Sequence, residues 1–106
     1  MTLNEQKLAV CKKLPELIHI QNHRTPELPL IRFYWKPYKR LESVSIYWQY
    51  EGLQVCHEAE KLLDSDKGEM MFYQRHLQRV SYPVYHATYE QRLKALCQVW
   101  WPKRFK

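Results

Sequence analysis

The chain has 106 residues, of which 45% are hydrophobic and 14% aromatic, with a net charge of +6. This length suits one domain spanning residues 1–106, and the composition excludes an intrinsically disordered chain. No apolar run is long enough to span a membrane, and the polar stretch Met1–Leu8 lacks the apolar core of a signal peptide. We therefore expect a small soluble protein of the cytoplasm. Three widely spaced cysteines, Cys11, Cys56 and Cys97, are a poor disulfide framework, so we expect reduced thiols buried on helices.

The charge is unevenly distributed along the chain. Residues 1–50 carry a net charge of +4, residues 51–69 carry −4 and residues 70–106 carry +6. This asymmetry favours a face that attracts a polyanion, and the alternative is an ordinary solvated surface.

A first helix is expected from Thr2 to about Leu14. Thr2 and Glu5 have the spacing of a capping box, and Pro15 ends the helix because it lacks an N–H group. The apolar edge of this helix consists of Leu8, Cys11 and Leu14.

Two strands of a β-hairpin are expected next, over residues 16–22 and 30–36. Both segments are rich in β-forming residues, and prolines flank the second. Alternation places Phe33 and Trp35 on one face of the second strand and its polar residues on the other. Because a two-stranded hairpin is marginal alone, it must pack on the helices.

Three further helices are expected after the hairpin. The strongest helical periodicity covers residues 47–63, and Asp66 with Glu69 has the capping pattern that opens the next helix. The segment Ser81–Tyr85 ends that helix, and the last one follows Thr88, with Gln91 in the capping position. The residues expected on the buried sides are Trp48, Gly52, Val55, Cys56, Ala59, Leu62, Leu63, Met70, Tyr73, Leu77, Val80, Tyr89, Leu93, Leu96, Cys97 and Trp100. The predicted fold is an α+β domain, mainly helical, with about four amphipathic helices packed with a short two-stranded β-hairpin.

The sequence offers little for catalysis or for metal binding. His57 and Glu60 are three apart beside Cys56, but Lys61 occupies the place where a metalloprotease helix carries its second histidine. No C-x-x-C pair exists, no serine lies in a nucleophile elbow, and the two isolated glycines cannot form a phosphate-binding loop. We expect no enzyme, no cofactor and no metal.

The stretch from Arg32 to Tyr50 is rich in aromatic and basic residues, and the C-terminal tail is basic too. Lysine and arginine can neutralise phosphates while exposed aromatic rings stack on unpaired bases, but the same residues can simply form a core. The candidate interaction surface consists of Arg32, Tyr34, Lys36, Tyr38, Lys39, Arg40, Trp101, Lys103 and Arg104.

Three segments, Leu14–Ile18, Phe33–Lys36 and His86–Leu96, together resemble small uncharacterised proteins of tailed bacteriophages and prophages. The resemblance spans most of the chain and implies a compact accessory protein made in a bacterial cytoplasm. None of the three segments is a known active site, so the resemblance assigns no functional residue.

Two hypotheses of function follow. The first is a non-catalytic interaction protein that binds another protein or itself. The alternative is a basic nucleic-acid-binding protein that uses the aromatic and basic stretch 32–50 and the C-terminal tail.

Overall fold

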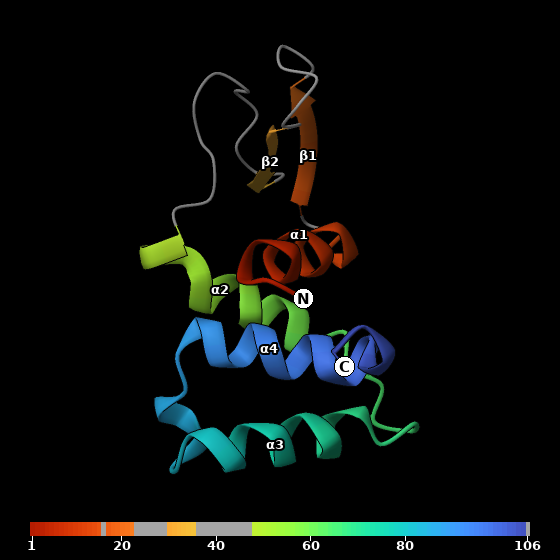
Figure 1. The fold of residues 1–106 in the computed structure, drawn as a ribbon, viewed down its shortest axis with the longest axis vertical. Helices are drawn as coiled ribbons and strands as arrows, with labels where there is room; N and C mark the ends of the chain where they lie inside the picture. Colours follow the sequence, from red (N-terminus) through yellow and green to blue (C-terminus); the bar gives the residue numbers. More distant parts are fainter. Residues whose placement is uncertain (16, 23–29, 36–47, 106) are drawn as a thin grey trace.

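The computed structural model describes residues 1–15, 17–22, 30–35 and 48–105. Its helices are α1 (Leu3–Lys13), α2 (Trp48–Glu60), α3 (Glu69–Val80), α4 (Tyr89–Trp100) and the short 3₁₀ helices η1 (Val84–His86) and η2 (Pro102–Phe105). Helix α4 is central, because α1, α2 and α3 all pack against it (Figure 1). Within the described residues, no helix is both long enough and apolar enough to traverse a lipid bilayer.

The prediction of an α+β domain is wrong, because the packed body of the protein is all-helical. Every core residue in the described part comes from a helix, from the C-cap Leu14 of α1 or from a turn that joins helices. The segments β1 (Leu17–Asn22) and β2 (Leu30–Trp35) pair antiparallel with each other, with Leu17 opposite Trp35. They lie beyond α1, on its far side from α3 (Figure 1). Since α1, α2 and α3 already cover the apolar face of α4, the helical core is complete without a sheet.

The capping boxes predicted for the first and last helices are confirmed. The Thr2 hydroxyl accepts a hydrogen bond from the Glu5 N–H at 3.2 Å, and the Glu5 carboxylate accepts one from the Thr2 N–H at 3.3 Å. Thr88 and Gln91 form the same reciprocal pair at 3.2 and 3.0 Å. Both helices therefore begin at the residue that follows the predicted threonine.

The cap predicted for α3 is wrong. Its N-cap is Gly68, whose φ of +72° lies in the left-handed region that favours glycine. The Glu69 carboxylate does not reach back to Asp66 but accepts from the Asp64 N–H at 2.8 Å. Asp66 instead donates its own N–H to the Asp64 carboxylate at 2.9 Å. The two carboxylates thus build the turn between α2 and α3, and the glycine starts the helix.

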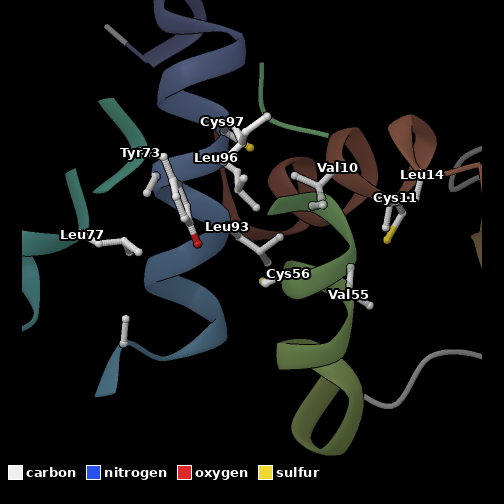
Figure 2. Packing of buried hydrophobic residues seen from close by; sticks show 14 residues of the cluster. Val10, Cys11, Leu14, Val55, Cys56, Tyr73, Leu77, Leu93, Leu96 and Cys97 are labelled. Carbon is white, nitrogen blue, oxygen red and sulfur yellow. The ribbon is translucent and has the colours of Figure 1, made fainter. Parts of the chain in front are cut away.

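The core lies between the four helices, with α4 at its centre (Figure 2). In Figure 2, Leu93 and Leu96 of α4 face Val10 of α1, while Tyr73 and Leu77 approach from α3. Most of the burial predicted for α2 and α4 is confirmed. The fully buried side chains include Val10, Cys11, Val55, Cys56, Ala59, Leu77, Leu93, Leu96 and Cys97.

Several positions depart from the predicted burial. Leu62 is 37% exposed because α2 ends at Glu60, so the helical periodicity no longer applies to it. Its neighbour Leu63 is buried. Val80, the last residue of α3, is also exposed, and Val10 is fully buried although the predicted apolar edge of α1 did not include it.

Candidate functional site

The aromatic and basic stretch of the candidate surface lies mostly outside the described residues. This applies to Lys36, Tyr38, Lys39 and Arg40. Arg32 and Tyr34 belong to β2, where their backbones pair with Ile20 and Ile18 of β1. A surface formed by this stretch therefore stays a prediction.

The C-terminal part of the candidate surface is described. Trp101 is the C-cap of α4 and is half-buried, with its ring 5.8 Å from that of Trp100 in an edge-to-face arrangement. The ammonium group of Lys13 lies 4.6 Å from the centre of the Trp100 ring, at a distance typical of a cation–π contact. Lys103 and Arg104 are exposed. Trp101 is thus packed against its own chain, while the two cations remain accessible.

A groove lies between the first turns of α2 and α4. We call it the tyrosine groove; it has a volume of about 400 Å³. Its lining consists of Gln49, Tyr50, Leu53, Thr88, Tyr89 and Glu90. The Tyr50 side chain is 84% exposed and Leu53 is 46% exposed. Large hydrophobic side chains that remain this exposed beside a concave surface are typical of binding sites.

A close approach of α2 and α4 forms the floor of the tyrosine groove. Gly52 is buried against Tyr89, whose ring carbon would lie only 2.5 Å from a Cβ atom added to Gly52. Trp48 lies beside the Tyr89 ring at 5.8 Å, and the Lys7 ammonium group lies 5.1 Å from the Trp48 ring. The floor is therefore fixed by packing, whereas Tyr50 and Leu53 on the rim are free to contact a partner.

The sequence did not reveal this groove. The periodicity placed Gly52 and Tyr89 on buried faces, and Tyr50 entered only as the end of the aromatic and basic stretch. Leu53 carried no signal of its own. The four come together through contacts between distant positions, such as that of Gly52 with the Tyr89 ring, 37 positions apart in the sequence.

A second constellation, formed by Glu60, Tyr73 and Arg92, joins three helices. The Glu60 carboxylate accepts hydrogen bonds from the Tyr73 hydroxyl at 2.7 Å and from the Arg92 guanidinium at 2.9 Å. Burial raises the pKa of Tyr73, and its hydrogen bond to Glu60 adds to the shift, so the phenol stays protonated at neutral pH. These groups satisfy one another inside the fold, which is the geometry of a structural cross-link.

The residues considered as metal ligands or as nucleophiles do not converge on a common site. His57 Nδ1 lies 3.4 Å from Glu60 Oε2, whereas the Cys56 thiol turns inward and donates to the Tyr89 carbonyl oxygen at 3.6 Å. In the described residues, no group of three or more His, Cys, Asp or Glu side chains is placed to hold a metal ion. Burial raises the pKa of each of the thiols of Cys11, Cys56 and Cys97 to about 12, so none is a thiolate at neutral pH.

A proposal of function for this chain rests on the geometry of its described residues. No family model, no curated protein and no solved structure matches this chain.

Proposed function

We propose that this protein is a non-catalytic interaction protein that binds another protein through the tyrosine groove. The observation that carries the proposal is the position of Tyr50, which is 84% exposed on the rim of a hollow of about 400 Å³. Tyrosine is favoured at protein interfaces because it combines a large apolar ring with a polar end. A partner that covers Tyr50 and Leu53 would bury their apolar surface without reorganising the floor of the groove.

The lining of the groove indicates the chemistry of the partner. Tyr50, Leu53 and Tyr89 offer apolar surface, so they suit an apolar side chain of the partner. Glu90 is the one charged residue among the described lining residues, and it is exposed. A basic residue beside the apolar one would pair with the Glu90 carboxylate. The expected partner is therefore a protein segment with an apolar anchor followed or preceded by lysine or arginine.

Capture by the immobilised protein, with and without nuclease, tests this proposal. A bacterial lysate is the natural source, since the phage resemblance suggests a bacterial host. We expect wild-type protein to retain a defined partner after nuclease treatment, and Tyr50→Ala to lose it. Tyr82→Ala is the matched control, because Tyr82 is 90% exposed and lies outside the groove.

Three outcomes would contradict the proposal. Capture that Tyr50→Ala leaves unchanged would place the binding surface elsewhere. Capture that nuclease abolishes would instead favour the nucleic-acid alternative, which uses the stretch 32–50 and the C-terminal tail. Concentration-dependent self-association in sedimentation experiments, lost in Tyr50→Ala, would identify the partner as a second copy.

A further inference from the structure

A second groove runs between α3 and α4, and its polar lining is basic. We call it the basic groove; its volume is about 230 Å³. Its lining consists of His76, Arg79, Val80, Gln91, Lys94, Ala95 and Gln98. No carboxylate occurs among these described lining residues, although α4 contains Glu90, which lines the tyrosine groove instead.

The cations of the basic groove are not neutralised within the described part of the chain. Arg79 and Lys94 are exposed, and neither takes part in the ion pairs found there, which join Glu60 to His57 and Arg92, and Glu58 to Lys61. Arg75 is exposed as well and lies one turn before Arg79 on α3. Two lining cations and Arg75 nearby therefore place three positive charges from two helices at the groove, none of them in an ion pair within the described part of the chain.

His76 responds to that potential. Partial burial lowers its pKa, and the neighbouring Arg79 guanidinium lowers it further. Of the other charged groups on these two helices, Arg75 and Lys94 are cationic and Arg92 is paired with Glu60. The carboxylate of Glu69 accepts from the Asp64 N–H, and Glu90 lines the tyrosine groove. An anion bound in the groove would reverse the electrostatic part of this shift.

We propose that the basic groove binds the phosphate backbone of a nucleic acid, with Arg79 and Lys94 as the phosphate ligands. The cations are spread along two helices over an open groove, which suits an extended polyanion better than a compact phosphate compound. The described lining contains no phenylalanine, tyrosine or tryptophan, so His76 carries the single ring that a base could contact there. Binding is therefore independent of base sequence and rests on phosphate contacts. This site is separate from the tyrosine groove and does not depend on it.

Salt-dependent binding of a fluorescent oligothymidylate, followed by anisotropy, tests the inference. Each phosphate contact contributes about −0.7 to the slope of log affinity against log salt on a single strand. Arg79→Gln and Lys94→Gln should each weaken binding and make that slope shallower by about 0.7. Lys67→Gln is the control, because it removes the same charge from an exposed position outside the groove. Circular dichroism checks that all three variants are folded.

A pH titration of the His76 ring by NMR gives a readout local to the groove. Addition of the oligothymidylate should raise the pKa of His76 in wild-type protein and leave it unchanged in the Arg79→Gln, Lys94→Gln double variant. Equal weakening by Lys67→Gln would overturn the inference, as would a His76 pKa that does not move. Binding of inorganic phosphate or of anionic vesicles without binding of the oligothymidylate would overturn it too.

Discussion

The guanidinium of Arg92 lies 2.9 Å from the carboxylate of Glu60, and this ion pair joins α4 to the end of α2 across 32 positions of sequence. Arg92 is almost completely buried. Its other nitrogens donate to the carbonyl oxygens of Ala87 at 3.1 Å and Val84 at 3.3 Å. The same side chain therefore fixes the connection that contains η1. With Tyr73 as a further donor to Glu60, three helices and one connection meet at a single carboxylate.

Loss of the Arg92 side chain should destabilise the fold strongly. Arg92→Met leaves the Glu60 carboxylate without its cation and leaves two carbonyl oxygens without a donor. Breaking a buried ion pair from one side costs about 3–5 kcal/mol, and the partial exposure of Glu60 favours the lower end of that range. The free energy of unfolding from urea titrations measures the loss.

A double-mutant cycle provides the control for Arg92→Met. Glu60→Gln removes the carboxylate charge with little change in shape, and the double variant carries no unpaired charge at this site. We expect it to be less destabilised than the sum of the two single variants. Strictly additive losses would show that the ion pair itself contributes nothing.

Gly52→Ala should destabilise the protein, although alanine is the better helix former. An added Cβ atom would lie 2.5–2.9 Å from three carbon atoms of the Tyr89 side chain. Such overpacking costs about 1–3 kcal/mol, which exceeds the gain of about 1 kcal/mol in helix propensity. The melting temperature measures the effect, with Gln54→Ala as the matched substitution at an exposed position of α2. A gain in stability for Gly52→Ala would contradict the tight contact.

The sequence predicted what local chemistry determines. The boxes of Thr2 with Glu5 and of Thr88 with Gln91 involve residues three apart, so their spacing is sufficient to define both helix starts. Helical periodicity likewise placed Val55 and most other core residues of α2 and α4 correctly, but it missed Ala95 of α4, which is buried. The cap of α3 failed because Asp64, outside the recognised pattern, competes for the Glu69 carboxylate and the Asp66 N–H group.

Contacts between distant residues carried no sequence signal. Glu60 stood beside His57 as a candidate metal ligand, and nothing in the chain indicated that Arg92 would pair with it. The grooves arise in the same way, from helix packing that joins Tyr50 to Tyr89 and Arg79 to Lys94. Periodicity also does not indicate where a helix ends, which is why Leu62 was assigned to the core.

Alanine substitutions at the two leucines that follow α2 distinguish the observed burial from the predicted one. Leu63→Ala removes a buried side chain and should cost about 2–5 kcal/mol through lost transfer energy and a cavity. Leu62→Ala should cost less, since this side chain is 37% exposed and follows the end of the helix. Urea denaturation of both variants provides the comparison. A larger loss of stability for Leu62→Ala than for Leu63→Ala would support the predicted continuous helical face over residues 47–63 instead.

The three buried thiols should make the fold sensitive to alkaline pH. Burial raises the pKa of Cys11, Cys56 and Cys97 from the usual 9.0 to about 12, so the folded state keeps protons that the unfolded chain releases. Their contribution to stability is complete below about pH 9 and is lost as the pH rises towards 12, at up to about 1.4 kcal/mol per pH unit for each thiol. The raised pKa of Tyr73 acts in the same direction. The midpoints of urea unfolding, measured below and above pH 9, report the loss.

Reaction with Ellman's reagent separates the thiols from the tyrosine. We expect all three thiols to be protected in the folded protein at neutral pH and to react once urea unfolds it. A thiol that reacts as fast without urea as with it would contradict the burial on which this prediction rests.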